Sequence, residues 1–166
     1  MLSRLGRRYP LVAASLLLAL SGSPTGWAGP PIIPGGSSAP TVSSLKNNLP
    51  LIQITAPNAQ GVSLNTYQQF NVPKSGAILN NAPTATTSQL GGSLGANPNL
   101  ASGAARLIIN EVLSNGPQST LKGQLEVAGT PAPVIIVNPS GIQCDGCGVR
   151  GIPQAHRNNG YATAES

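Results

Sequence analysis

The sequence predicts an all-β fold of the extracellular kind, in which short aliphatic strands alternate with tight turns. Charged residues make up 8% of the chain and aromatic residues 3%, which is too few for a salt-bridged helical bundle or a bulky aromatic core. The 20 glycines and 16 prolines separate short runs of valine, isoleucine and leucine. Beyond the first 28 residues, no helix start signal precedes a sustained 3.6-residue period. A solenoid of short strands is one architecture that this composition allows.

The N-terminal segment has the organisation of a secretory signal peptide. Arg4, Arg7 and Arg8 precede an uncharged run at 11–20, which is too short to cross a membrane as a helix. Small residues follow, and we expect cleavage after Ala28. No cysteine follows the apolar run directly, so a lipoprotein anchor is not expected. The two adjacent arginines leave a twin-arginine route as an alternative, although the flanking residues fit that signal poorly.

The positive charge of the chain is concentrated in this segment. The whole sequence has 9 Lys and Arg against 4 Asp and Glu, and the predicted cleavage removes three of the arginines. The remaining formal charge of +2 is too small to mark a nucleic-acid surface. We therefore expect no nucleic-acid partner.

Residues 29–50 are rich in Pro, Gly and Ser and lack an apolar period, so they are predicted to form a mobile N-terminal arm. A single ordered all-β domain is predicted from Leu51 onward. A short helix is the alternative for one segment, 106–113, although its β-branched residues favour a strand. Residues 82–95 are predicted to be a connection. The expected strands are 51–54, 61–72 in two segments, 76–81, 106–113, 119–129 and 134–137.

The segment 119–129 alternates apolar and polar side chains, which predicts one half-buried strand. The side chains expected to face inward and outward, respectively, are Leu121, Gly123, Leu125 and Val127, and Lys122, Gln124 and Glu126.

The run 134–137 holds four β-formers between two prolines, and is expected to be a strand buried on both faces. The four residues that follow, 138–141, suit a β-turn. Pro139 presets φ for the second turn position, and Gly141 closes the turn without strain.

Candidate catalytic and metal-binding residues are few beyond residue 28. His156 is the only histidine, and one His with two Cys does not supply the four ligands of a structural zinc site. The acidic residues lack the spacing of a catalytic pair: they are Glu111, Glu126, Asp145 and Glu165. We therefore expect no enzyme, no metal site, no cofactor and no small-molecule substrate.

Cys144 and Cys147 are the most specific chemical feature of the sequence. One interpretation is a structural disulfide that closes a small loop in an oxidising compartment. A second is a pair of free or transient thiols. A third is a thioredoxin-like redox pair, but that motif belongs at the N-terminus of a helix, and no helical pattern follows Gly148.

Asparagines recur at the ends of the apolar runs. Each one suits a turn, but their placement also suits side chains that bond the backbone across stacked turns. The residues are Asn80, Asn81, Asn97, Asn99, Asn110 and Asn138.

Together these features resemble the N-terminal secretion domain of two-partner-secretion exoproteins, the filamentous-haemagglutinin and haemolysin type that includes contact-dependent growth-inhibition toxins. The matching order and spacing cover roughly residues 51 to 148. The runs that carry the resemblance are 61–65 with Tyr67, 70–72, Gly76 with 78–81, 97–100, 110–112, Ser119 with Leu121 and Gly123, 126–129, 134–136 and 138–142.

The resemblance implies a right-handed parallel β-helix, preceded by capping strands that shield its end. The family usually has asparagine where Ser140 stands here, and serine still suits a turn. The two cysteines match a cysteine-bearing subgroup of the family. The two signature motifs, expected to serve transporter recognition, are Asn97, Pro98, Asn99 and Leu100, and Asn138, Pro139, Ser140, Gly141 and Ile142.

By the same resemblance, the chain is expected to cross the inner membrane of a Gram-negative bacterium through the Sec machinery and to stay unfolded in the periplasm. A dedicated outer-membrane β-barrel of the TpsB type is expected to bind it through periplasmic POTRA domains. Folding outside the cell would then help to draw the chain through, to the surface or the medium. We expect a monomer.

After Gly148 the sequence departs from the family pattern, in which an apolar strand and a long solenoid follow. Residues 149–166 are mostly polar and are predicted to be a disordered tail. We therefore hypothesise a truncated or frame-disrupted exoprotein that retains its targeting domain. The alternatives are a small self-contained secreted or surface adhesin, and a redox protein built on Cys144 and Cys147.

Overall fold

The computed structural model describes residues 30–153 and 164–165; the predicted cleavage site at Ala28 and the lone His156 lie outside these residues. None of its helical segments is long and apolar enough to span a bilayer. Its elements are β1 (Ile32–Pro34), β2 (Thr41–Ser44), η1 (Lys46–Asn48), β3 (Pro50–Gln53), β4 (Val62–Phe70), β5 (Ala77–Asn81), β6 (Thr86–Ser88), β7 (Gly92–Leu94), η2 (Pro98–Leu100), β8 (Leu107–Val112), β9 (Ser119–Leu121), β10 (Gln124–Gly129), β11 (Val134–Val137), β12 (Ile142–Cys144), β13 (Gly148–Arg150) and β14 (Ala164–Glu165).

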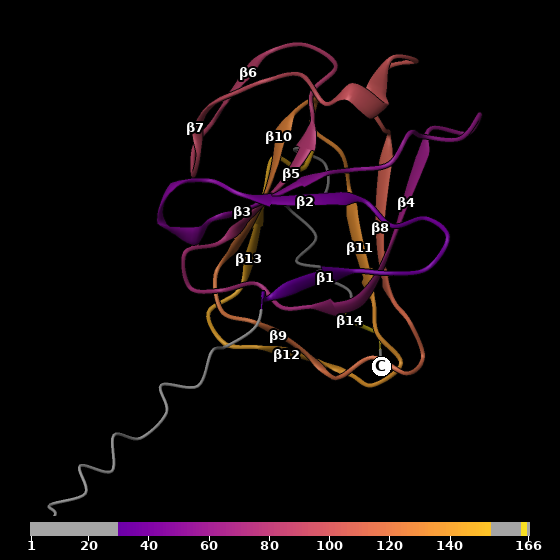
Figure 1. The fold of residues 1–166 in the computed structure, drawn as a ribbon, viewed down its shortest axis with the longest axis vertical. Helices are drawn as coiled ribbons and strands as arrows, with labels where there is room; N and C mark the ends of the chain where they lie inside the picture. The colour runs from indigo at the N-terminus through magenta and orange to yellow at the C-terminus, as the bar shows by residue number, and fades with distance from the viewer. Residues whose placement is uncertain (1–29, 154–163, 166) are drawn as a thin grey trace, which may run out of the picture.

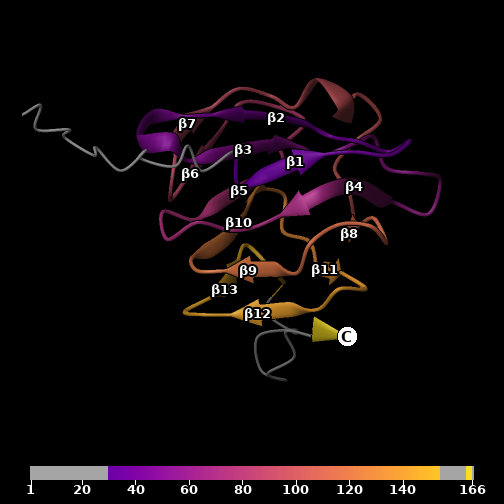
Figure 2. The same cartoon turned by 60° about the horizontal axis from the view of Figure 1, so that its bottom comes forward.

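The chain winds through three stacks of strands, which pair in parallel except for β1 and β2 at the N-terminal end. The first sheet has the order β13-β10-β5-β3-β2 and the second the order β1-β4-β8-β11-β14. The third stack is β9 with β12, extended by a parallel bridge from Val72 to Leu121. Each turn of the coil visits the three stacks in the same order (Figure 1). The first turn is β3, β4 and the Val72 bridge, the second β5, β8 and β9, the third β10, β11 and β12, and the fourth begins with β13 and β14. Figure 2 shows the turns layered from the N-terminal strands to β12 and β14. The all-β prediction is confirmed, and the strand pairing follows the pattern of a β-helix.

The core fills the inside of the coil because side chains of paired strands stack turn upon turn. In the first sheet, Ile52 pairs with Leu79 and Leu79 with Val127, and all three are buried. Alternate residues of a strand point to opposite faces, so every second residue joins this interior stack. In the second sheet, Tyr67 packs its ring 4.8 Å from that of Phe70. These two aromatic side chains, the ones that the described residues contain, are both fully buried in the core.

The prediction of a mobile arm at 29–50 is wrong for the described residues from 30 onward. β1 pairs antiparallel with β4, and β2 pairs antiparallel with β3. Ile32 and Leu49 are only 2% and 5% exposed. Strands this short need one or two apolar anchors rather than a visible period, and Pro34 is tolerated because β1 is an edge strand. These strands are the N-terminal cap that the family resemblance implied.

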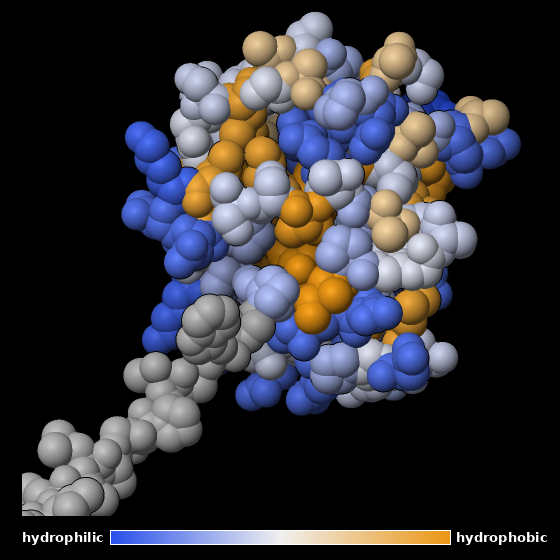
Figure 3. Space-filling view, viewed as in Figure 1, coloured by the Kyte–Doolittle hydropathy of each residue, from blue (hydrophilic) through white to orange (hydrophobic). Residues whose placement is uncertain are grey.

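The predicted connection at 82–95 contains a hairpin, because β6 and β7 pair antiparallel. This β6–β7 hairpin lies on the outer face of the first sheet, over a second apolar cluster. Figure 3 shows apolar side chains reaching the surface beside the hairpin and between the cap strands. The hairpin strands are rich in Thr, Ser and Gly and owe their order to this packing, which no local pattern encodes. The cluster comprises Leu49, Leu51, Ile78, Leu94 and Ala128, with Leu45 and Leu90 against it.

The single strand predicted at 119–129 is two strands, β9 and β10, separated by a corner at Lys122 and Gly123. A β-carbon at Gly123 would lie 2.3 Å from the Pro73 carbonyl oxygen, so the backbones of two turns touch there. Glu126 was expected to face solvent, yet it is 4% exposed. It points outward from the coil, but the β6–β7 hairpin covers it.

The strand β11 is not buried on both faces as predicted. Val134 and Ile136 pack against the core, whereas Val137 is 39% exposed. One face of a coil strand points inward, and the other is buried only where another element covers it. The hairpin covers the first sheet; on the second, the outer face shows an apolar ladder in which Leu64 pairs with Ile109 and Ile109 with Ile135.

The predicted disordered tail at 149–166 is also partly wrong. Residues Gly148–Arg150 form β13, which pairs in parallel with β10. Residues Ala164–Glu165 form β14, which pairs in parallel with β11. The backbone thus begins a fourth turn with a polar sequence, because strand pairing needs only backbone groups.

Candidate functional site

The first signature motif forms a corner between the first and second sheets. Asn97 is 2% exposed and caps η2. Its Nδ2 donates to the carbonyl oxygens of Ile54, at 3.0 Å, and Asn80, at 2.8 Å, while its Oδ1 accepts from the Asn99 amide at 3.0 Å. One amide side chain therefore satisfies backbone groups of three segments.

The rest of this motif divides between core and surface. Leu100 is 1% exposed and packs in the main core. Pro98 begins η2, where its missing N–H is not needed, and it is exposed. Asn99 is exposed as well, although its Nδ2 donates to the Ile54 carbonyl at 3.0 Å.

The second signature motif repeats this chemistry at the corner between β11 and β12. Asn138 is 1% exposed, and its Nδ2 donates to the Pro117 carbonyl and to Ser119 Oγ, each at 2.9 Å. Its Oδ1 accepts from the Ser140 amide at 2.9 Å. The Gly141 amide donates to the Asn138 carbonyl at 2.9 Å, which closes the β-turn that the sequence predicted.

Gly141 has a φ of +95°, a conformation that favours glycine. Ser140, the departure from the family pattern, donates from its hydroxyl to the Gly116 carbonyl at 2.8 Å. Pro139 and Ser140 are exposed, while Ile142 is half-buried against the core.

The structure does not bring the two motifs together. The first bonds to segments that follow β3 and lie in β5, and the second bonds to the segment between β8 and β9. Each presents a proline and one polar residue to solvent, with an asparagine buried beneath them. The motifs are therefore two separate corners of similar design rather than one composite site.

Asn81 acts in the same way, so the expectation of backbone bonding across turns is confirmed for it, whereas Asn110 bonds only the Tyr67 side chain among the described residues. Asn81 donates to the carbonyls of Ala105 and Thr130, at 2.9 and 2.8 Å, and accepts from the Ala105 amide. Sequence reasoning missed Asn65 and Asn71, whose Oδ1 atoms accept from the amides of Thr55 and Thr120. Asn71 follows the apolar Phe70 at a strand end, which was the available signal.

One buried pair links the first and second turns inside the core. The Tyr67 hydroxyl donates to Asn110 Oδ1 at 2.8 Å, and the Asn110 Nδ2 has no partner among the described residues. Burial raises the pKa of Tyr67 well above its ordinary value of 10.0. This pair serves packing and register.

The structure joins Cys144 and Cys147 in a disulfide, with a Cα–Cα distance of 5.3 Å. Between them the Asp145 amide donates to the Leu121 carbonyl at 2.9 Å, and Gly146 has a φ of +80°. The next element is strand β13, so the geometry offers no helix N-terminus to activate a thiolate. The structural interpretation fits this arrangement better than the redox interpretation.

The disulfide borders an apolar cavity of about 340 Å³ at the C-terminal end of the coil. The side chains that line the cavity include Leu121, Leu125, Val134, Ile136, Ile142 and Val149. They come from the interior faces of several strands, so the cavity lies at the end of the core as the described residues form it. In the described part of the chain, no group of three or more His, Cys, Asp and Glu side chains lies close enough to hold a metal ion.

Comparison with known proteins decides the family. The sequence model of the TPS secretion domain matches residues 32–152. This chain belongs to the TPS secretion domain family. The matched region includes the cap strands and both signature corners, so it begins well before the predicted start at Leu51.

Two relatives and one solved structure show the extent of the similarity. The chain is 46% identical over 138 residues to the tRNA nuclease CdiA-2 of Burkholderia pseudomallei (strain 1026b), covering 82% of this chain and 4% of that protein. It is 43% identical over 137 residues to a hemolysin of Serratia marcescens, covering 82% of this chain and 8% of that protein. The crystal structure of the filamentous hemagglutinin secretion domain is 40% identical, with a TM-score of 0.67, and the match covers 73% of this chain and 39% of that one.

The chain therefore spans less than a tenth of the length of these two relatives, and the part shared with them is the secretion domain. The nuclease and hemolysin activities in their names are those proteins' own. A TPS domain is recognised by an outer-membrane transporter of the TpsB type, and exoproteins of this kind reach the cell surface or the medium. The resemblance inferred from the sequence is confirmed.

Proposed function

We propose that this chain is the export signal of a haemagglutinin-like adhesin or contact-dependent inhibition exoprotein, and that the POTRA domains of its transporter read it in the periplasm. The route begins with Sec-dependent passage across the inner membrane and cleavage after Ala28. The observation that carries the proposal is the family match over 32–152, which spans both signature corners. The domain acts as a monomer and uses no cofactor.

The burial of the two signature asparagines supports the idea that the transporter recognises the chain before it folds. In the folded structure, the side chains of Asn97 and Asn138 are 2% and 1% exposed and are engaged in internal hydrogen bonds. They are accessible to a partner only while the corners are unformed. Unfolded strands with exposed backbone groups can also pair with a sheet edge of the transporter. Folding then hides these groups and releases the chain.

A binding measurement with the periplasmic domains of a TpsB-type transporter from the same bacterium tests the proposal. The chain is either diluted from urea immediately before mixing or refolded first. We expect the unfolded chain to bind at least about tenfold more tightly than the folded chain, a difference of about 1.4 kcal/mol. Equal affinity of the unfolded and refolded chains for the transporter domains would contradict recognition before folding. If neither form binds, the proposal is wrong. The alternative hypothesis, a small self-contained adhesin, predicts that result.

Variants of the second corner separate recognition from folding. Asn138→Ala and Ser140→Ala each remove one side chain of the motif, and Asn115→Ala serves as a control in the preceding corner. The unfolded chain has no corner to disrupt, so any loss of binding by its variants is a direct effect. We expect Asn138→Ala to weaken binding of the unfolded chain and Asn115→Ala to leave it unchanged.

A further inference from the structure

The carboxylate of Glu126, on β10 in the third turn, bonds the β6–β7 hairpin. Its Oε2 accepts from the Ser88 hydroxyl and the Leu90 amide, both at 2.9 Å, and its Oε1 accepts from the Gln89 amide at 2.8 Å. The side chain is 4% exposed. The three donors lie at the end of β6 and in the turn that follows it, 36 to 38 residues earlier in the chain. This contact therefore depends on two segments that are remote in sequence.

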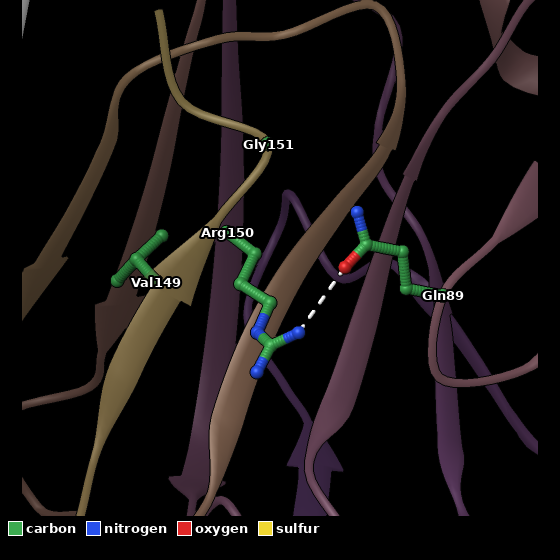
Figure 4. A pocket seen from close by; sticks show the side chains of 4 residues that line it. All are labelled: Gln89, Val149, Arg150 and Gly151. Carbon is green, nitrogen blue, oxygen red and sulfur yellow. Dashed lines mark hydrogen bonds between the residues drawn. The ribbon is translucent and has the colours of Figure 1, made fainter. Parts of the chain in front are cut away.

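Strand β13 of the fourth turn also contacts the hairpin, on the same face of the first sheet. Glu126 pairs in register with Arg150 of β13, so the two side chains leave neighbouring strands on the same face. The Arg150 Nη1 donates to Gln89 Oε1 at 3.1 Å (Figure 4). Its Nε donates to Gln124 Oε1 at 3.3 Å. Arg150 is exposed, so its contribution is smaller than that of the buried carboxylate.

The first and second turns supply only an apolar seat for the hairpin. Leu90 and Leu94 pack in the outer cluster with Ile78 of β5. The approach is close at Gly91, where a β-carbon would lie 2.6 Å from Ile78 Cδ1 and 2.7 Å from Leu45 Cδ1. This seat partly buries Leu90, whose amide also donates to Ser88 Oγ at 3.2 Å, but it offers the Gln89 amide no acceptor in the contacts described.

We propose that Glu126 is a latch that makes docking of the hairpin conditional on folding of the third turn. Before β10 is in place, docking on the apolar seat would leave the Gln89 amide without an acceptor and the Leu90 amide with only its 3.2 Å bond to Ser88 Oγ, which opposes docking. Once β10 joins β5, the carboxylate arrives beside these groups and completes the site. During export from the N-terminus to the C-terminus, the hairpin leaves the pore before β10. The hairpin is therefore not fixed on the first sheet until the third turn forms. This inference goes beyond the proposed function and does not depend on the transporter.

Native-state hydrogen exchange on the full chain tests the latch. In Glu126→Ala, we expect the Gln89 and Leu90 amides to exchange on the order of tenfold to a hundredfold faster, the range for loss of a hydrogen bond to a charged group. Amides of the β2–β3 pair serve as the reference for global stability. Their change in exchange rate in the variant is subtracted from the change measured for the hairpin amides. Glu111→Gln, an exposed glutamate on β8, is the matched control and should change neither set. If the hairpin amides accelerate only in parallel with the β2–β3 amides, the proposal is overturned.

Pulse-labelled refolding of the wild-type chain gives a second readout that does not depend on a variant folding. We expect the Gln89 and Leu90 amides to gain protection together with β10 and later than the β2–β3 pair, which is local in sequence. Protection of the hairpin amides before β10 would overturn the proposal.

Discussion

The side chain of Asn97 ties two turns of the coil together, because its Nδ2 donates to the Asn80 carbonyl of β5 at 2.8 Å and also reaches the Ile54 carbonyl after β3. Backbone carbonyls at the end of a parallel sheet have no further strand partner at such a corner. A buried amide side chain replaces that partner. The corner is thus closed by side-chain chemistry rather than by continued pairing.

Asn97→Ala should therefore destabilise the domain more than its small change in volume suggests. It leaves the buried Asn80 carbonyl without this donor, and an unsatisfied buried polar group costs about 1–3 kcal/mol. Urea unfolding should show a lower midpoint with an unchanged slope. Asn99→Ala is the control, because Asn99 is exposed and the Ile54 carbonyl keeps its bond from Asn97. Equal losses in the two variants would contradict the role given to Asn97.

Tyr67 should make the domain less stable in alkali. Its pKa is raised by burial in the folded state above the value of 10.0 that it has when exposed. The unfolded chain then loses the phenol proton first, so the tyrosine's contribution is complete below about pH 10 and falls as the pH rises above it. Unfolding free energies at pH 8 to 11 should decline more steeply for the wild type than for Tyr67→Phe. Parallel pH profiles for the two proteins would argue against this burial.

Tyr67→Phe should also weaken the domain at neutral pH. It removes the donor to Asn110 Oδ1 and leaves that buried amide with neither of its polar atoms bonded, at a cost of about 1–3 kcal/mol. Tyr67→Phe combined with Asn110→Val, which removes the orphaned amide, should recover part of the loss. The measurement is urea unfolding at pH 7, and no recovery in the double variant would count against this explanation.

Gly123→Ala should destabilise the corner between β9 and β10. The added β-carbon would lie 2.3 Å from the Pro73 carbonyl oxygen and 2.9 Å from the Gly76 nitrogen, both backbone atoms. Overpacking of this kind costs about 1–3 kcal/mol or more. Gly95→Ala is matched to it, because no atom lies within 4 Å of the added carbon there. Thermal unfolding should separate the two variants, and identical melting temperatures would show that the corner relaxes freely.

Reduction of the disulfide should leave the fold intact and lower its stability modestly. Closing so small a loop restricts the unfolded chain by about 2 kcal/mol at most in the chain-entropy description. Oxidised and reduced wild-type chain can be compared directly by urea unfolding, with Cys144→Ser/Cys147→Ser as the permanently reduced form. A loss much larger than this would mean that the cysteines also support β12 and β13 through packing.

The sequence was informative where local chemistry decides the structure. The apolar runs at 77–81 and 107–112 became β5 and β8, and the turn at Asn138 formed as its residues predict. The position of the cap strands and the β6–β7 hairpin escaped prediction because their few apolar residues are stabilised by elements distant in the chain. The burial of Glu126 was not predicted for the same reason. A charged residue at an outward-facing strand position is expected to be exposed to solvent unless the element that covers it is known.

The turn repeat was hidden by unequal spacing. Gln124 pairs with Gly148, 24 residues later, whereas Leu125 pairs with Ala77, 48 residues earlier. The second turn carries the hairpin and η2 as additional chain, so no fixed period survives in the sequence. The signature asparagines were recognisable as candidates, but their burial and partners depend on which turns stack beside them.

The short spacing of the two cysteines bears on how the chain can travel. A disulfide between distant positions would tie the polypeptide into a wide loop, and a pore would have to admit two strands side by side. Here the bond encloses only Asp145 and Gly146 between Cys144 and Cys147. The oxidised polypeptide can therefore still be fully extended, with only one slightly wider point at the disulfide. The disulfide can thus form before or after the chain passes a narrow channel.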